Sequence, residues 1–170
     1  MSTITKQRGF TLLETLVYAG GLVLLLVAML TLLAATYDWY RTATVGSHVD
    51  SVGITVSDHI VKSIRSGQSV NAAGTAFGTT LGSLSLSAQA NSVQLTKQYT
   101  ISNGRLTYQE NSGTIQYLTP SDVTISRFYL TNISTPISTA IHFDIDITFN
   151  LKGVNQTRTY SGAAIMRNSY

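Results

Sequence analysis

The chain begins with nine mostly polar residues and then becomes almost wholly apolar. Between residues 10 and 37, Glu14 is the one side chain expected to carry a charge at neutral pH. Residues 16–35 form a run of twenty residues, which as a helix rising about 1.5 Å per residue reaches across a hydrocarbon core of about 30 Å. The pattern predicts a membrane-spanning helix over residues 10–36.

The charges beside this run indicate its orientation. Lys6 and Arg8 precede the apolar residues, and basic residues next to a membrane span stay on the cytoplasmic side. We therefore expect a single-pass protein at the inner membrane, with its N-terminus in the cytoplasm and its C-terminal part outside.

Helical periodicity continues beyond the apolar run. Apolar residues recur there at steps of three and four, at Val45, Val49, Val52, Val56, Ile60 and Ile64, and this spacing places them on one face of a helix. Residues 37–66 are thus predicted to be amphipathic, with Gly46 and Gly53 as positions of bending. Ser66 and Gly67 mark the expected end of the helix.

After residue 67 the pattern changes to short alternating segments of β type. Asn103 and Gly104 predict a type I′ hairpin turn between two of them. The expected strands cover residues 83–88, 92–102, 105–110, 114–119, 123–131, 140–151 and 157–166. We expect one antiparallel meander whose apolar face is covered by the stripe on residues 45–64. The predicted class is α+β, with a leader (1–9), a membrane helix (10–36), an amphipathic helix (37–66) and a β-rich head (67–170).

Charge and cysteine content narrow the functional classes. Of the eleven Lys and Arg residues, Lys6 and Arg8 lie in the leader, which leaves nine against eight Asp and Glu. These nine are scattered singly, so a phosphate-binding patch and a nucleic-acid partner are not expected. The absence of cysteine from the sequence excludes disulfides and thiol chemistry.

Three interpretations of the N-terminal segment compete. A secretory signal peptide has a shorter apolar core and a small-residue cleavage site, which Ala34 and Ala35 match only weakly. A plain membrane anchor fits the length but leaves Glu14 unexplained, because a carboxylate costs about 2.5–3.5 kcal/mol at the middle of a bilayer.

The third interpretation is a resemblance carried by residues 8–14, Arg-Gly-Phe-Thr-Leu-Leu-Glu. This segment resembles the processing site of type IV prepilins and pseudopilins. The resemblance implies cleavage between Gly9 and Phe10 by a membrane-embedded prepilin peptidase, methylation of the new amine of Phe10, and a pilin-like fold. The order of the later elements is most similar to that of J-type minor pseudopilins.

A physical argument gives Glu14 a role in subunit assembly. Cleavage leaves a positive amino group on Phe10, about one helical turn from the Glu14 carboxylate. In a low dielectric an unpaired carboxylate is costly, so pairing with the Phe10 amine of a neighbouring subunit favours one axial register of the filament.

The sequence offers little support for a metal site. His48 and His59 lie eleven residues apart, too far along a helix to share a metal. His142, Asp144 and Asp146 alternate along a predicted strand, and we expect them to form a solvated strand face. Four tyrosines would be able to stack on nucleobases or sugars if exposed, namely Tyr99, Tyr108, Tyr117 and Tyr129. Tyrosine is also an ordinary strand former, and we favour that interpretation. No nucleophile, nucleotide-binding or metalloprotease motif occurs in the sequence, so we expect no catalytic residue, metal or cofactor.

The primary expectation is a structural subunit of a type IV pilus-like or type II secretion filament. Its partners would be other pilin subunits, the prepilin peptidase, an inner-membrane assembly platform and membrane lipid. A pilin-type module for DNA uptake or adhesion is the main alternative, and a membrane-tethered envelope enzyme is a more distant one.

Overall fold

A computed structural model describes residues 11–90, 93–135, 138–151 and 154–166. By internal contacts the chain divides into two compact units, Met1–Ala43 and Thr44–Tyr170. Helix α1 (Leu12–Ser66) contributes residues 12–43 to the first unit and residues 44–66 to the second. The long N-terminal apolar helix and the antiparallel sheets expected from the sequence are both present, so the α+β class is confirmed.

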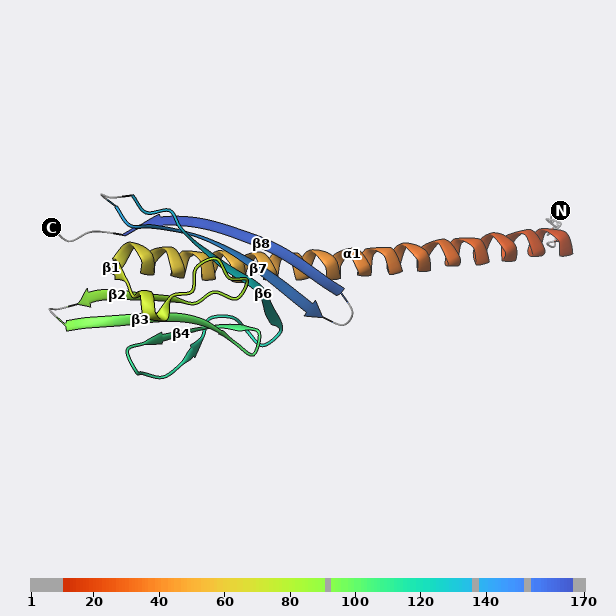
Figure 1. Cartoon of the computed structure of the whole chain (residues 1–170). Coiled ribbons are helices and arrows are strands. Elements are labelled where there is room, and N and C mark those ends of the chain that lie inside the picture. The colour runs from red at the N-terminus through yellow and green to blue at the C-terminus, as the bar shows by residue number, and fades with distance from the viewer. Residues whose placement is uncertain (1–10, 91–92, 136–137, 152–153, 167–170) are drawn as a thin grey trace, which may run out of the picture. The chain divides into compact units, whose positions relative to one another are not determined.

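All the strands belong to the second unit (Figure 1). Five form one antiparallel sheet and three form another, in the orders β1-β2-β3-β4-β5 and β6-β7-β8. A short 3-10 helix, η1 (Ala72–Gly74), lies between β1 and β2. The strands are β1 (Gly67–Val70), β2 (Leu84–Ala90), β3 (Val93–Ser102), β4 (Arg105–Glu110), β5 (Gln116–Tyr117), β6 (Val123–Asn132), β7 (Ala140–Leu151) and β8 (Val154–Ile165).

The expectation of a single meander is wrong, because the β6 edge that faces away from β7 is occupied by residues 78–82. The amide of Phe128 donates to the Thr80 carbonyl at 2.8 Å, and the Gly82 amide donates to the Phe128 carbonyl at 2.7 Å. An isolated parallel bridge joins Leu81 to Phe128. These contacts leave β5 at the end of its own sheet, paired with β4 over only two residues.

The apolar stripe of the helix packs as the sequence predicts. Its buried members join the inward side chains of both sheets in one core, and Val52 is half-buried against it. The fully buried residues from the sheets include Leu84, Leu106 and Phe128. Burial of this face stabilises residues 44–66 as a helix more than intrinsic propensity does.

Gly46 and Gly53 have a packing role against β8. A Cβ at Gly46 would lie 3.4 Å from Gln156 Oε1, and a Cβ at Gly53 would overlap the ring of Tyr160. The lack of a side chain at Gly53 therefore lets Tyr160 of β8 approach the helix closely, whereas a Cβ at Gly46 would be at an ordinary contact distance. The helix ends at Ser66, as predicted, and β1 follows directly from Gly67.

Local turn chemistry predicts the β3–β4 hairpin correctly. Asn103 and Gly104 have φ values of 52° and 70°, the two positive values that a type I′ turn requires. The bounds of β4 and β7 match the prediction, β8 begins three residues earlier, and β5 is much shorter than predicted.

Candidate functional site

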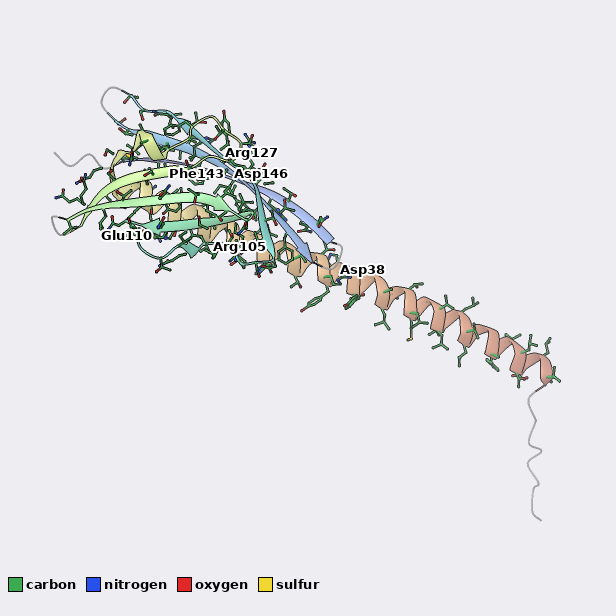
Figure 2. All side chains as sticks on the ribbon, turned by 60° about the horizontal axis from the view of Figure 1, so that its bottom comes forward. Asp38, Arg105, Glu110, Arg127, Phe143 and Asp146 are labelled. Atoms are coloured by element: carbon green, nitrogen blue, oxygen red, sulfur yellow. The ribbon has the colours of Figure 1, made fainter. Side chains whose placement is uncertain are left out.

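The first candidate is the apolar surface of α1 in the first unit. One described helix is long and apolar enough to cross a membrane, and none of its most apolar stretch is buried within the chain. Leucine, valine and methionine side chains are exposed on all sides of residues 12–33 (Figure 2). A soluble surface rarely exposes apolar area of this extent, and by length and composition this stretch is suited to cross a membrane.

The polar side chains of this segment are compatible with a membrane. The hydroxyls of Thr15, Thr31 and Thr36 donate to backbone carbonyls of the preceding turn at 2.8–2.9 Å. A hydroxyl that already has an acceptor inside its own helix does not need water. These threonines therefore add little to the cost of inserting the helix in a bilayer.

Glu14 lies in the first turn of α1 and is exposed. Its amide lies 3.3 Å from Thr11 Oγ1, which accepts the hydrogen bond expected of an N-cap residue. A carboxylate in this turn also interacts favourably with the helix dipole. Thr11 thus caps the helix through the backbone amide of Glu14, and the pairing of the Glu14 carboxylate with Phe10 stays a prediction. Gly9 and Phe10, the predicted processing residues, lie outside the described residues.

Gly20 and Gly21 leave two adjacent positions of the apolar helix without side chains. A Cβ at either position would meet nothing within 4 Å in the chain, so neither glycine is required by packing inside the described part of this unit. Small residues on membrane helices allow another helix to approach closely.

Three exposed aromatic residues, Tyr37, Trp39 and Tyr40, follow the apolar run. The guanidinium carbon of Arg41 lies 5.8 Å from the centre of the Tyr37 ring. Aromatic and basic side chains of this kind are enriched where a helix leaves a bilayer, so their position agrees with the predicted end of the span.

A second candidate lies between the helix and the five-stranded sheet. Tyr99 and Tyr108, which could stack on a ligand only if they were exposed, are buried and lie in β3 and β4. The Tyr99 hydroxyl donates to Ser63 Oγ at 2.5 Å and lies 2.9 Å from His59 Nδ1. Burial raises the pKa of Tyr99 to about 12, so the hydroxyl stays protonated.

The same cluster extends to a carboxylate at its edge. The Tyr108 hydroxyl donates to Glu110 Oε2 at 2.7 Å, and burial raises the pKa of Tyr108. The His59 ring meets both tyrosine rings edge-on, with centroid separations of 5.8 Å to Tyr99 and 5.1 Å to Tyr108. Burial, followed by the charges of Lys97 and Lys62, lowers the pKa of His59 below 6.5.

This cluster joins α1 to the five-stranded sheet. Sequence analysis missed it because residues 59 and 99 are distant in the chain. The one indication in the sequence that His59 is partly buried is its position beside Ile60 and Val56, two buried residues of the apolar stripe.

The alternating residues of β7 form a polar sheet face, as predicted. Asp144 Oδ1 accepts from Ser161 Oγ, and Asp146 Oδ1 accepts from Thr159 Oγ1, each at 2.7 Å. Arg127 is paired with Asp146 across β6 and β7, and the two lie together on this face (Figure 2). The carboxylates therefore have partners within the sheet, and no group of three potential metal ligands occurs among the described residues.

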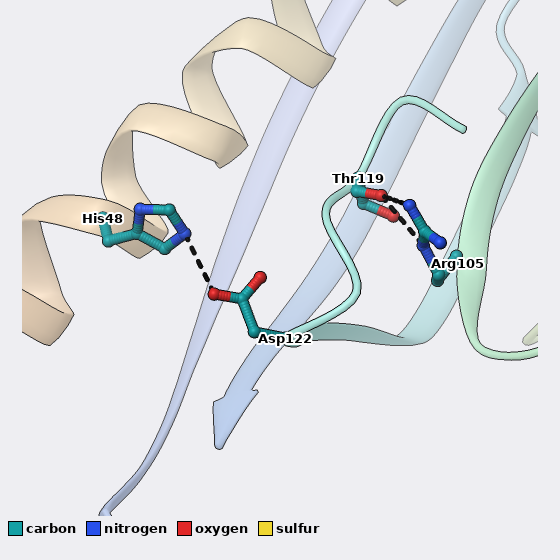
Figure 3. A network of polar contacts seen from close by, with 4 residues as sticks. All are labelled: His48, Arg105, Thr119 and Asp122. Carbon is teal, nitrogen blue, oxygen red and sulfur yellow. Dashed lines mark hydrogen bonds and ion pairs between the residues drawn. The ribbon is translucent and has the colours of Figure 1, made fainter. Parts of the chain in front are cut away.

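Polar contacts also fix the ends of β4 and β6 (Figure 3). Arg105 donates through Nε and Nη2 to the Thr119 carbonyl, at 2.9 and 2.5 Å. Nearby, His48 Nε2 lies 3.5 Å from Asp122 Oδ2. His48 and His59, which the sequence separates, thus contact different parts of the head.

Comparison with protein-family models, with curated proteins and with solved structures gives no significant match to this chain. The geometry on its own shows a helix, α1, with an apolar stretch suited to a membrane. Residues 44–66 of the same helix pack against the β-rich part of the second unit.

Proposed function

We propose that this chain is a structural subunit of a type IV pilin-like filament, made as a precursor and processed at the inner membrane. The observation that carries the proposal is the exposed apolar surface of residues 12–33 with Glu14 at its start. The resemblance of residues 8–14 to a prepilin processing site supports it, as does the β-rich unit that follows.

In this proposal a prepilin peptidase cuts between Gly9 and Phe10 and methylates the Phe10 amine. The apolar helix then stays in the membrane until an assembly platform adds the subunit to the filament. There the lipid around the helix is replaced by helices of neighbouring subunits, and Glu14 pairs with the Phe10 amine of one of them. The β-rich unit lies outside, in the periplasm or beyond the cell.

The described residues favour this structural role over a DNA-uptake or adhesion module. Burial of Tyr99 and Tyr108 removes two of the four aromatic rings proposed as a stacking platform. Arg105 and Arg127 cover the rings of Tyr117 and Tyr129, with their guanidinium carbons 4.0 and 5.1 Å from the ring centres. Assignment to the J-type minor pseudopilins is part of the same proposal and rests on the order of the elements.

Mass spectrometry of the mature chain tests the proposal. The full chain is produced with an aspartyl prepilin peptidase in bacterial membranes, and its N-terminus is measured. We expect a chain that begins at Phe10 and carries one additional methyl group. Gly9→Val should block cleavage, whereas the leader variant Thr3→Ala should be cut normally. A chain that retains Met1, or one cut near Ala35, would overturn the proposal.

A further inference from the structure

Two histidines of α1 lie against different sheets and meet different charges. His48 Nε2 lies 3.5 Å from Asp122 Oδ2, where β6 begins (Figure 3), and its ring packs edge-on against Phe149 of β7. His59 contacts the five-stranded sheet, with Nδ1 2.9 Å from the Tyr99 hydroxyl. Because the two sheets are separate sets of hydrogen-bonded strands, a change at one histidine can act on one sheet without the other.

The surroundings of His59 oppose a positive charge on its ring. The residue is half-buried between the helix and the sheet. Burial is the largest cause of its lowered pKa, and the charges of Lys97 on β3 and Lys62 on α1 act in the same direction. Asp58 acts in the opposite direction, but it is paired with Lys62 at 2.6 Å. Protonation of the folded chain at His59 is therefore unfavourable.

The hydrogen bonds of the cluster indicate where an added proton goes. The Tyr99 hydroxyl donates its one proton to Ser63 Oγ, so its bond to His59 uses the proton of Nδ1. Acid then adds the second proton at Nε2 and creates a charged donor that needs an acceptor or water. The other titratable pair of the cluster is already joined, because the Tyr108 hydroxyl donates to Glu110 Oε2 at 2.7 Å.

The contacts of α1 with the three-stranded sheet do not share this weakness. A protonated His48 faces the carboxylate of Asp122, and an ion pair between exposed side chains is neutral to modestly favourable. These side chains are 45% and 41% exposed, so water reaches both. A further contact contains no histidine, since the Tyr160 hydroxyl of β8 donates to Asp50 Oδ1 at 2.7 Å.

We propose that acid loosens the five-stranded sheet from α1 while the three-stranded sheet stays in place. Protonation of His59 raises the population of states in which its ring is hydrated, and these states require β3 and β4 to move away from residues 59–63 of the helix. The two separate sheets and the two differently placed histidines thus make one side of the head sensitive to pH. The inference concerns the head alone and holds whether or not the chain enters filaments.

Hydrogen–deuterium exchange of the full chain in detergent tests the inference, with intrinsic rates corrected for pH. Between about pH 7.5 and about pH 5, amides of β3 and β4 should lose protection by up to about thirtyfold, the limit for a histidine of ordinary pKa that stays neutral when folded. Amides of β6 and β7 should be unchanged or gain up to about fivefold, the range of an exposed ion pair. Equal losses in both sheets, or no loss in β3 and β4, would overturn the inference.

Matched variants identify the group that titrates. His59→Gln should remove most of the loss in β3 and β4, whereas the control His48→Gln should keep it. Lys62→Gln is an exposed substitution that removes a cation and leaves Asp58 unpaired, so it should make the loss smaller without disturbing the core. Circular dichroism at about pH 7.5, above the ordinary histidine pKa, shows that each variant is folded. A loss that neither His59→Gln nor Lys62→Gln reduces would assign the effect to another group and overturn the inference.

Discussion

Gly53 of α1 and Tyr160 of β8 touch so closely that a methyl group at position 53 would overlap the tyrosine ring. The Tyr160 hydroxyl donates to Asp50 Oδ1 at 2.7 Å, and Arg158 Nε lies 3.5 Å from the same oxygen. Burial, with help from Asp50, raises the pKa of Tyr160 to about 12. One glycine thus sets how β8, and with it the three-stranded sheet, sits on the helix.

Gly53→Ala should therefore destabilise the second unit. Overpacking costs about 1–3 kcal/mol, and the better helix propensity of alanine returns about 1 kcal/mol, so a net loss of up to about 2 kcal/mol is expected. The free energy of unfolding is measured by urea denaturation of the full chain in detergent. Gly46→Ala is the matched control, because its nearest neighbour, Gln156 Oε1, would lie 3.4 Å away. The control should be neutral or stabilising, and equal losses in both variants would contradict the packing argument.

The position of His59 predicts that stability falls at acid pH. Its pKa is lowered in the folded chain by burial and by Lys97 and Lys62, against the opposing effect of Asp58. The unfolded chain then binds a proton near pH 6.5 while the folded chain still resists it. The contribution of His59 to stability is complete above about pH 6.5 and is lost as the pH falls towards the lower, folded pKa.

The measurement compares urea midpoints at about pH 7.5 and about pH 5, on either side of the ordinary histidine pKa. His59→Gln should reduce the difference between the two midpoints relative to the unmodified chain. Tyr99→Phe should lower stability by about 0.5–1.5 kcal/mol at both pH values, because the bonds of its hydroxyl to Ser63 and His59 are lost. A midpoint difference that His59→Gln leaves unaltered would show that another group titrates.

The hairpin turn offers a test of local backbone strain. Gly104 has a φ of 70°, and a Cβ there would lie 3.0 Å from Thr124 Cγ2. Gly104→Ala should cost about 1–2 kcal/mol, since L-residues are disfavoured in this conformation. Asn103→Gly should be tolerated, because glycine adopts a positive φ readily. Thermal melting of the two variants followed by circular dichroism distinguishes them.

Variants at Glu14 and Thr11 distinguish the effect of helix capping on assembly from that of subunit pairing. If Glu14 pairs with the Phe10 amine of a neighbour, Glu14→Gln should be processed normally but should enter sheared filaments at least about tenfold less often, since a charged partner would be left unpaired. Thr11→Ala removes the cap at a cost of about 1 kcal/mol and keeps the carboxylate, so it should assemble. Quantitative proteomics of sheared filaments gives the ratio. Equal assembly of both variants would contradict the pairing of Glu14 with the Phe10 amine.

The extent to which the fold and the candidate site could be predicted from the sequence differs between elements. The apolar stripe from Val45 to Ile64 was found because a helix repeats every 3.6 residues, and the β3–β4 turn because Asn-Gly has few alternative conformations. β1 was missed because four residues, Gly67–Val70, are too few to show an alternating pattern. Burial of Tyr99 was missed because strand propensity does not indicate which face of a strand meets a helix.

By itself the sequence determined the features that depend on neighbouring residues: the apolar helix, the position of Glu14 within it, the amphipathic stripe, the hairpin turn and most strand bounds. Only the tertiary structure decided that the strands divide into two sheets, because residues 78–82 occupy the edge of β6. It also decided that β8 lies on Gly53 and keeps its outer edge open. These outcomes depend on which distant segments compete for the same backbone hydrogen bonds and the same space, and residues far apart in the chain carry no local pattern that records that competition.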